Sequence, residues 1–207
     1  MANPRVRDLR WLLVFAGIAV LLVLDYVFTP WLGSTRPEDW PRYRLLIDHG
    51  AHLAGDGLNL ALVGVALWLV GAGWSLPRWR IAGRWVIWAV CLAGFWSQAL
   101  KLTIGRPRPR QLLLHGYWAP KGPNITPSFD SFPSGHAMTV FAVTGLLSAL
   151  FPRYRMALLV FAVAVSVGRV YGGDHFPSDI LLGSLMGVQL GRYVAGRWAA
   201  EVADEAA

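Results

Sequence analysis

Long apolar stretches separated by short polar breaks dominate the pattern of the chain. A helix needs on the order of 20 apolar residues to cross a bilayer core of about 30 Å. Six stretches approach that length: approximately Trp11–Leu32, Leu58–Trp74, Ile81–Leu100, Ser134–Phe151, Met156–Tyr171 and Ser178–Val194. Six such stretches in 207 residues leave no polar face for water. The pattern therefore predicts an all-α, integral-membrane bundle of six transmembrane helices, with 1–207 as a single domain.

Basic residues in two of the short breaks indicate how this bundle lies in the membrane. The break at 75–84 contains three arginines and the break at 152–155 contains two, and neither contains an acidic residue. By the positive-inside rule, these breaks and both termini face the cytoplasm. The opposite, outer face then receives the connections at about 33–57, 101–133 and 172–177.

The composition agrees with a membrane protein and narrows its partners. Hydrophobic residues make up 55% of the chain. The net charge of +7 could indicate nucleic-acid binding, but basic residues in an apolar chain more often lie at bilayer interfaces, so no nucleic-acid partner is expected. The single cysteine, Cys91, lies in an apolar stretch, which excludes an intramolecular disulfide. The tail at about 199–207 is polar enough to be disordered.

A candidate anion site lies in "PSGH", 133–136, at the predicted start of an apolar helix on the outer face. Ser134 is a favourable N-cap, and the helix behind it presents free backbone N–H groups from Gly135 onward. Gly135 permits the close approach of a phosphate, and His136 would lie beside that anion, where it can donate a proton. The alternative is an ordinary N-cap followed by a glycine.

A candidate nucleophile lies in "GGDHFPSD", also on the outer face. His175 and Asp179 are four residues apart and fall on one helix face. The carboxylate can orient the imidazole, which leaves the other ring nitrogen as a nucleophile or base. No serine or cysteine stands in a nucleophile-elbow setting, so His175 is the candidate nucleophile.

Cations at the neighbouring helix ends complete the expected site. Lys101, Arg108 and Arg169 would form a clamp on a transferring phosphoryl group, whose oxygens carry negative charge. Arg106 and Arg110 could join the clamp, or they could contact solvent or a lipid phosphate.

These motifs resemble those of the type-2 phosphatidic acid phosphatase superfamily of integral-membrane lipid phosphatases. The first signature of the family, Lys, six residues and Arg-Pro, matches 101–109, and the second, Pro-Ser-Gly-His, matches 133–136. The third, Ser-Arg, five residues, His, three residues and Asp, matches 168–179, with Gly168 in place of the usual serine.

The resemblance implies a mechanism without a metal or cofactor. His175 attacks phosphorus, Asp179 orients it and His136 protonates the leaving oxygen; water then hydrolyses the phosphohistidine. The phosphate is held by Lys101, Arg108, Ser134, Gly135 and Arg169. Such an enzyme acts at the outer surface of the cytoplasmic membrane on a lipid phosphate or diphosphate. Undecaprenyl diphosphate is the first expectation, followed by phosphatidylglycerol phosphate, phosphatidic acid and lipid A 1-phosphate.

Several alternatives stay open at the level of the sequence. The same intermediate would serve a lipid phosphotransferase, and a cationic pocket would also serve a lipid transporter. Asp48, His52 and Asp56 would align on a helix, either as a metal site or as an interfacial polar face. The loop 110–132 is either an interfacial rim or a plain packed loop. Asp25 is expected to have a cationic partner, and the oligomeric state is open.

Overall fold

The structure is a computed structural model that describes residues 16–17, 19–30 and 40–206. Within these ranges the regular structure is helical throughout, with no strand, which confirms the all-α prediction. The helices are Ala19–Pro30, α2 (Trp40–Gly55), α3 (Gly57–Gly73), α4 (Pro77–Ile104), α5 (Pro109–His115), α6 (Gly135–Leu150), α7 (Arg155–Gly172) and α8 (Pro177–Ala206). Two short 3-10 turns, Pro127–Phe129 and Pro152–Tyr154, complete the elements.

The predicted apolar stretches coincide with helices, although fewer of these helices are long enough to span a membrane. In the described part of the chain, Pro77–His115 and Pro152–Gly172 have the required length and apolar composition. A bent pair, α2 from Leu46 onward and α3, would make a third span, with a bend of 46° at Asp56. Part of the first predicted stretch lies outside the described residues. The arrangement of six spans therefore stays a prediction.

Glycines allow α6 and α8 to pack with their backbones in contact. Gly183, Gly187 and Gly191 recur every fourth residue along α8. A Cβ added at Gly187 would lie 2.4 Å from the carbonyl oxygen of Met138, and one at Gly183 would lie 2.7 Å from that of Ser134. Small residues at such spacing are typical of helix packing in membranes. Because the two backbones touch, the start of α8 is held against the start of α6.

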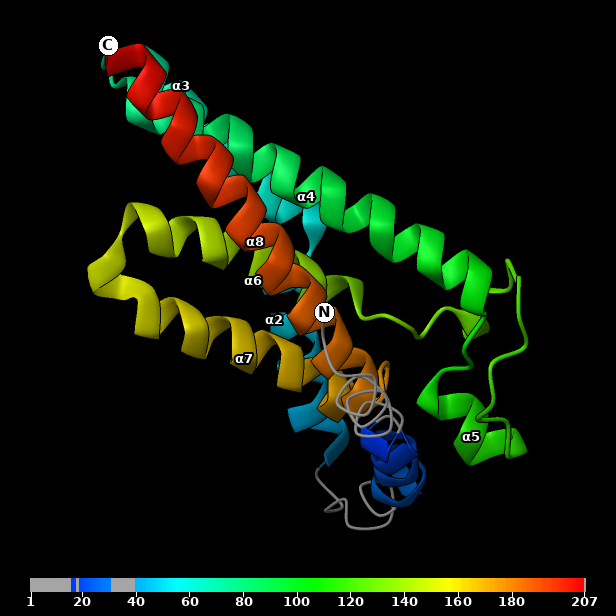
Figure 1. Cartoon of the computed structure of the whole chain (residues 1–207). Helices are drawn as coiled ribbons and strands as arrows, with labels where there is room; N and C mark the ends of the chain where they lie inside the picture. Colours follow the sequence, from blue (N-terminus) through cyan, green and yellow to red (C-terminus); the bar gives the residue numbers. More distant parts are fainter. Residues whose placement is uncertain (1–15, 18, 31–39, 207) are drawn as a thin grey trace, which may run out of the picture.

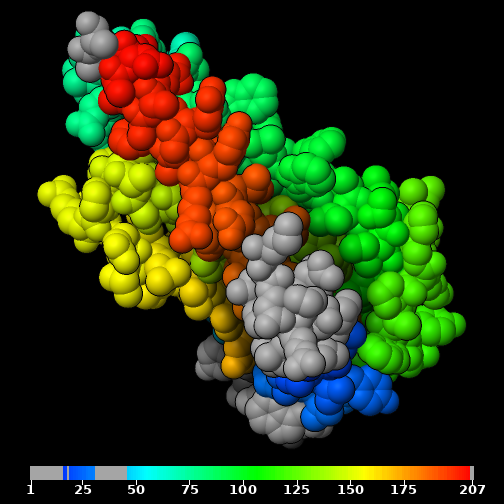
Figure 2. Space-filling view, viewed as in Figure 1, coloured from blue at the N-terminus to red at the C-terminus, as the bar shows by residue number. Residues whose placement is uncertain are grey.

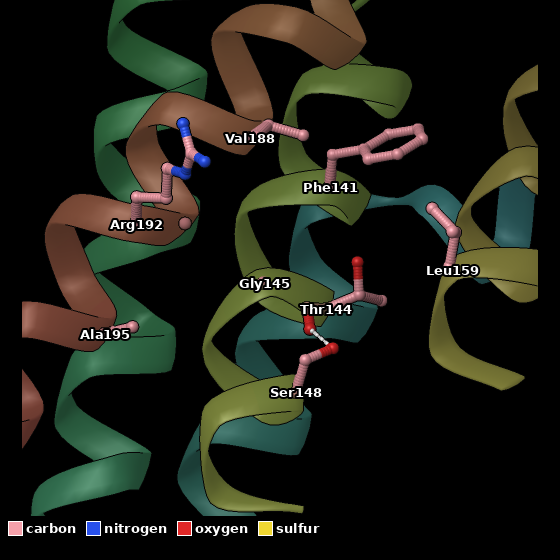
Figure 3. A pocket seen from close by; sticks show the side chains of 9 residues that line it. Phe141, Thr144, Gly145, Ser148, Leu159, Val188, Arg192 and Ala195 are labelled. Atoms are coloured by element: carbon pink, nitrogen blue, oxygen red, sulfur yellow. Dashed lines mark hydrogen bonds between the residues drawn. The ribbon is translucent and has the colours of Figure 1, made fainter. Parts of the chain in front are cut away.

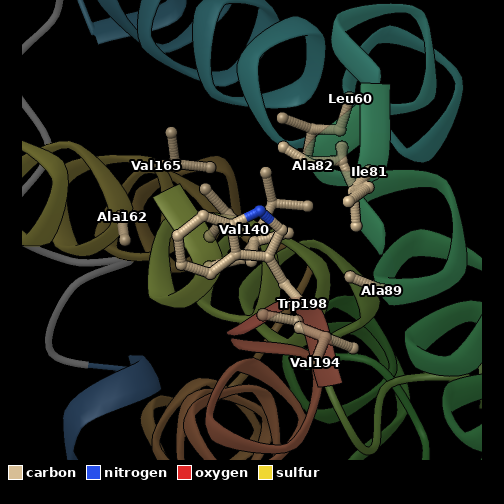
Figure 4. Close-up of a cluster of buried hydrophobic side chains, with 13 residues drawn as sticks. Leu60, Ile81, Ala82, Ala89, Val140, Ala162, Val165, Val194 and Trp198 are labelled. Atoms are coloured by element: carbon tan, nitrogen blue, oxygen red, sulfur yellow. The ribbon is translucent and has the colours of Figure 1, made fainter. Parts of the chain in front are cut away.

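The core lies around α6, which packs against α4, α7 and α8. Val140, Ala162 and Val194 meet there, together with Ile81 and Trp198 (Figure 4). Exposed large apolar side chains lie on α2, α3, α4, α7, α8 and the helix Ala19–Pro30, as a protein surrounded by lipid requires, whereas α6 exposes none and is enclosed by its neighbours. Interior packing and lipid contact thus use different faces of the same helices.

The connections lie at two opposite ends of the bundle. In Figures 1 and 2, the turns at 74–76 and 151–154 and the end of α8 lie at the upper left, whereas α5 and the helix Ala19–Pro30 lie at the lower right. The two arginine-containing breaks are therefore at the end away from α5. Which of the two ends faces the cytoplasm stays a prediction from the positive-inside rule.

The expected disorder of the tail at 199–207 is wrong for the residues that the structure describes there. The helix α8 continues to Ala206. Glu201 accepts hydrogen bonds from Arg84 and from the indole N–H of Trp85, the latter at 2.9 Å, and Glu205 pairs with Arg80 at 3.0 Å. The carboxylates that make the tail polar thus bind the basic start of α4.

Candidate active site

The "PSGH" motif has the predicted helix-capping geometry. The side chain of Ser134 accepts a hydrogen bond from the Ala137 N–H at 3.4 Å, and α6 begins at Gly135. A Cβ added at Gly135 would lie 2.9 Å from Ser97 Oγ and 3.9 Å from Lys101 Nζ. The glycine therefore keeps open the space between the α6 N-terminus and Lys101, which is where an anion bound to the N–H groups would lie.

His175 lies buried in the short loop between α7 and α8. Its Nδ1 is 2.7 Å from the backbone carbonyl oxygen of Ser131. A carbonyl can only accept, so Nδ1 carries the proton and Nε2 keeps its lone pair. Burial lowers the pKa of His175 well below its ordinary value, and the charges of Lys101, Arg108 and Arg169 lower it further. The imidazole is therefore neutral at neutral pH, as a nucleophile must be.

Asp179 makes no hydrogen bond to His175, although their spacing in the sequence predicts a direct contact. Its Oδ2 is 3.9 Å from His175 Nδ1 and instead accepts hydrogen bonds from Ser131 Oγ at 2.6 Å and the Phe176 N–H at 2.9 Å. The link between the two side chains thus runs through Ser131, whose hydroxyl binds Asp179 and whose carbonyl binds His175. Sequence reasoning missed Ser131 because a backbone carbonyl leaves no signal in residue type.

Arg106 joins neither the clamp nor the solvent, and both expectations for it are wrong. Its guanidinium is buried, donates to Asp179 at 2.5 Å, Ser178 Oγ at 2.6 Å and Asp25 at 2.8 Å, and lies 4.4 Å from the ring centroid of Phe176. The expected cationic partner of Asp25 is therefore confirmed. A buried arginine between two carboxylates fixes the start of α8 against the helix Ala19–Pro30.

The two arginines of the clamp are held by carboxylates. Arg108 donates to both oxygens of Asp130, at 2.7 and 2.9 Å, and to Asp174 at 3.1 Å. Arg169 donates to the other oxygen of Asp174 at 2.5 Å and to Asp48 at 2.6 Å. Asp174 therefore bridges the two arginines and fixes their spacing.

Two of the three clamp cations, Lys101 and Arg169, are only partly engaged by the described residues. Burial alone would raise the pKa of Asp130. The hydrogen bonds and charge of Arg108, together with the charge of Lys101, outweigh that effect, so the pKa lies below its ordinary value and the carboxylate stays ionised. Lys101 makes no ion pair with any residue that the structure describes. The Nε of Arg169 is buried and has no hydrogen-bond partner among the described residues. Both cations can thus take a further anionic partner.

Gly168 is explained by the approach of α2. A Cβ added there would lie 2.6 Å from the Cβ of Ala51, and one at Gly172 would lie 2.4 Å from an oxygen of Asp48. The position where the family usually has serine therefore faces a neighbouring helix in this chain, with no room for a side chain.

The polar residues of α2 lie along the site. Asp48 binds Arg169, and the ring of His52 lies edge to face against His136 with centroids 4.9 Å apart. Asp56 caps α3 through its Oδ1. The Nε2 of His136 is buried without a hydrogen-bond partner among the described residues. The polar residues of α2 therefore do more than form a polar face at the membrane interface, because α2 forms one wall of the site.

Two cavities near the bundle surface differ in chemistry. A polar one of about 300 Å³ adjoins the clamp and is lined by Arg108, Arg110, Gln111, Asp130 and Asp174, with 127–128 and Gly173. Residues of the loop 110–132 form part of its wall. Elsewhere in this loop, Lys121 lies against the rings of Tyr117 and Phe129. A cavity of about 200 Å³ between α6, α7 and α8 contains no residue of the three motifs and only one charged side chain, Arg192 (Figure 3).

The fold and this site define a helical protein with apolar spans and a cluster of histidine and cationic side chains at one end of the bundle. The PAP2 superfamily model matches residues 82–200, a range that contains all three motifs. The chain therefore belongs to the PAP2 superfamily, as the motifs indicate.

Several curated relatives in this family are phosphatases of lipids. The lipid A 1-phosphatase of Rhizobium etli is 33% identical over 144 residues, which cover 64% of this chain and 62% of that protein. For the lipid A 1-phosphatase of Rhizobium johnstonii, the match covers 43% of the relative. The decaprenylphosphoryl-5-phosphoribose phosphatase of Mycobacterium tuberculosis is 34% identical over 161 residues, covering 77% of this chain and 80% of the relative.

Solved structures of two family members have the same fold. The crystal structure of Aquifex aeolicus LpxE superposes with a TM-score of 0.59 at 25% identity, covering 81% of this chain and 92% of that one. The transmembrane PAP2 type phosphatidylglycerolphosphate phosphatase of Bacillus subtilis superposes with a TM-score of 0.54 at 22% identity, covering 95% of this chain and 96% of that one.

Proposed function

We propose that this chain is a membrane phosphatase that hydrolyses a lipid phosphate or diphosphate through a phosphohistidine at His175. The observation that carries the proposal is the state of that imidazole. It is buried, it donates from Nδ1 to Ser131, and three cations are near enough to lower its pKa. A fixed tautomer with a free Nε2 beside a cationic clamp is the arrangement required of a histidine that attacks phosphorus.

The reaction proceeds in two displacements. Nε2 of His175 attacks phosphorus, the bond between phosphorus and the lipid oxygen breaks, and His136 gives its proton to that oxygen. A water molecule then attacks the phosphohistidine, returns a proton to His136 and releases inorganic phosphate. Asp179 and Ser131 act as positioning residues, because they hold the attacking imidazole without touching the substrate.

The clamp binds the phosphoryl group in both steps. Lys101 and the free Nε of Arg169 supply donors, and the N–H groups at Gly135 with the Ser134 cap supply the floor of the pocket. Arg108 exchanges part of its pairing with Asp130 and Asp174 for phosphate oxygens. These charges perform the role that a metal ion has in other phosphoryl transfers, so the mechanism is metal-independent.

The lipid reaches this pocket from the membrane. An apolar groove of about 470 Å³ lies beside the loop that holds His175, and it is lined by residues of α6, α7, α8 and the helix Ala19–Pro30, among them Val167, Val170, Pro177, Ile180 and Leu181. Its position fits a lipid chain whose head group enters the clamp. With both termini cytoplasmic, this end of the six-span bundle lies at the outer surface of the cytoplasmic membrane.

The substrate is a lipid phosphate or diphosphate that presents its head group at this surface. Undecaprenyl diphosphate, phosphatidylglycerol phosphate, phosphatidic acid and lipid A 1-phosphate all meet this requirement. Two rival functions use the same pocket: a phosphotransferase would pass the phosphoryl group to an acceptor, and a lipid transporter would release the lipid unchanged. The paired His175 and Ser131 favour chemistry over transport, because binding alone needs no nucleophile.

A phosphate-release screen over these four lipids, with purified protein in detergent, tests the proposal. We expect at least one lipid to give inorganic phosphate without any acceptor, and we expect His175→Ala to be slower by on the order of 10³-fold or more. Equal release by His175→Ala would exclude the phosphohistidine mechanism. Release that depends on an added acceptor lipid would identify a phosphotransferase instead.

A further inference from the structure

Three side chains that could bind a metal, one of them His136, meet next to the proposed phosphate clamp. His52 lies in the last turn of α2, Asp56 lies between α2 and α3, and His136 lies in the first turn of α6. One ligand atom from each lies within 4.8 Å of the others. We call these three residues the His52–Asp56–His136 cluster.

A glycine brings α2 close enough to form this cluster. A Cβ added at Gly55 would lie 2.7 Å from Val165 Cγ1 and 3.0 Å from Cδ2 of His136. Only glycine permits this approach, and it brings Asp56, the next residue, and His52, three residues earlier, close to the His136 ring. The cluster is therefore fixed by helix packing and does not depend on long side chains meeting by chance.

Each member of the cluster has an atom available for a ligand. His136 Nε2 is buried and has no hydrogen-bond partner in the described part of the chain. Asp56 uses only Oδ1 to cap α3, accepting from Leu58 N at 2.9 Å and Asn59 N at 3.3 Å, which leaves Oδ2. His52 is exposed, so an ion can reach the cluster from the solvent.

We propose that the His52–Asp56–His136 cluster binds Zn²⁺ and that the bound ion inhibits the enzyme. Two imidazole nitrogens and one carboxylate oxygen form a common zinc ligand set, with a water in the fourth position. Ligand atoms of a tetrahedral zinc site lie roughly 3.4 Å apart, so the exposed His52 side chain would rotate on binding to bring the ligand atoms from within 4.8 Å to that spacing. The charge of Arg169 near the site is offset by its ion pair with Asp48.

Inhibition follows from the role of His136 and so rests on the proposed function. A metal on Nε2 occupies the lone pair that would otherwise hold the proton for the leaving oxygen. Zinc would therefore stop turnover without entering the phosphate clamp. The ion is a regulator of this site and has no part in the two displacement steps.

Zinc binding is tested first without turnover, by calorimetry on His175→Ala protein that has been stripped with a chelator. We expect one Zn²⁺ per chain, and at least tenfold weaker binding when His52→Ala or Asp56→Asn is added. Asn keeps the cap of α3 because its side-chain oxygen can accept the same bonds. His49→Ala, a matched exposed histidine on α2, should bind as tightly as the parent. Equal affinity in all variants, or no stoichiometric binding, overturns the site.

Inhibition is tested second, with each variant compared with its own metal-free rate. We expect Zn²⁺ to inhibit phosphate release by the wild-type protein and the concentration for half inhibition to rise at least tenfold in His52→Ala. Stoichiometric binding without inhibition would overturn the regulatory role. If zinc binds to His175→Ala while the wild-type protein releases phosphate from no lipid, the proposed function fails and the metal site stands.

Discussion

At the residue scale, Ser131 explains how the chain holds His175, the proposed nucleophile, without a direct hydrogen bond to a carboxylate. Its carbonyl accepts from His175 and its hydroxyl donates to Asp179, which is itself neutralised by Arg106. The backbone of one residue thus fixes the tautomer, and its side chain anchors that backbone to the start of α8. The position of the imidazole depends on a small hydrogen-bond network in place of a single ion pair.

Substituting the hydroxyl alone tests this network. Ser131→Ala keeps the carbonyl that binds His175 but leaves Asp179 with one bond fewer, a loss of about 1–3 kcal/mol for a buried group. We expect kcat to fall by about tenfold with little change in KM, because the clamp is untouched. Steady-state kinetics with Ser128→Ala as a matched control measures this. A Ser131→Ala enzyme with wild-type kcat would show that the hydroxyl does not position His175.

The protonation state of His175 gives a second prediction at this scale. A pKa lowered well below 6.5 means that the folded protein keeps this ring neutral while the unfolded chain takes up a proton as pH falls through 6.5. The group therefore reduces stability only as pH falls below the unfolded pKa, and above that value it has no effect. Nitrogen NMR of ring-labelled histidine at pH 6.5 should show Nδ1 protonated and Nε2 unprotonated, with His175→Gln assigning the signals. An imidazolium signal for His175 at that pH would contradict the assigned state.

At the element scale, the contact between α6 and α8 determines whether the motifs meet. The two helices touch through Gly183, Gly187 and Gly191, and the Ser134 N–H donates to the carbonyl of Asp179 at 3.1 Å. That hydrogen bond joins the helix start that would bind phosphate to the helix start beside His175, the proposed nucleophile. The close packing of glycines is thus the structural basis of the site.

Adding one methyl group tests the contact between the helices. Gly187→Ala places a Cβ 2.4 Å from the Met138 carbonyl oxygen, so the helices must separate, at a cost of about 1–3 kcal/mol. Gly196→Ala on the same helix meets nothing within 4 Å and is the matched control. We expect Tm in detergent to fall by several degrees for Gly187→Ala and to stay level or rise for Gly196→Ala. The same Tm for both variants would contradict the backbone contact.

Sequence reasoning succeeded where the type of a residue indicates its chemistry. It failed where a role depends on contacts between residues distant in sequence or on contacts made by backbone atoms. The apolar stretches predicted the helical fold, and the motifs indicated a site at adjacent helix ends. The role of Arg106 could not be predicted, because its partners Asp25 and Asp179 are distant in sequence. The role of α2 as a wall of the site was missed for a related reason. Asp48 contributes to the site through its ion pair with Arg169, which lies on another helix.

At the scale of the whole molecule, the orientation in the membrane decides which lipids the site can reach. Lys121 lies in the loop near the clamp and Arg153 lies in the turn at the opposite end of the bundle, and both are exposed. In a Cys91→Ala background, Lys121→Cys should be labelled by an impermeant thiol reagent on intact cells, whereas Arg153→Cys should be labelled only after permeabilisation. The reverse pattern would place the active site on the cytoplasmic side.

The most direct measurement for the central claim is to trap the covalent intermediate. Purified protein is mixed with a lipid phosphate that it hydrolyses, labelled at phosphorus. The reaction is quenched within milliseconds under alkaline conditions that preserve phosphohistidine, and the protein is digested for mass spectrometry. We predict phosphate on the peptide that contains His175, attached at Nε2, and none in His175→Asn. Phosphate released by the wild-type protein at full rate, with no labelled peptide or with label at another residue, would contradict the account.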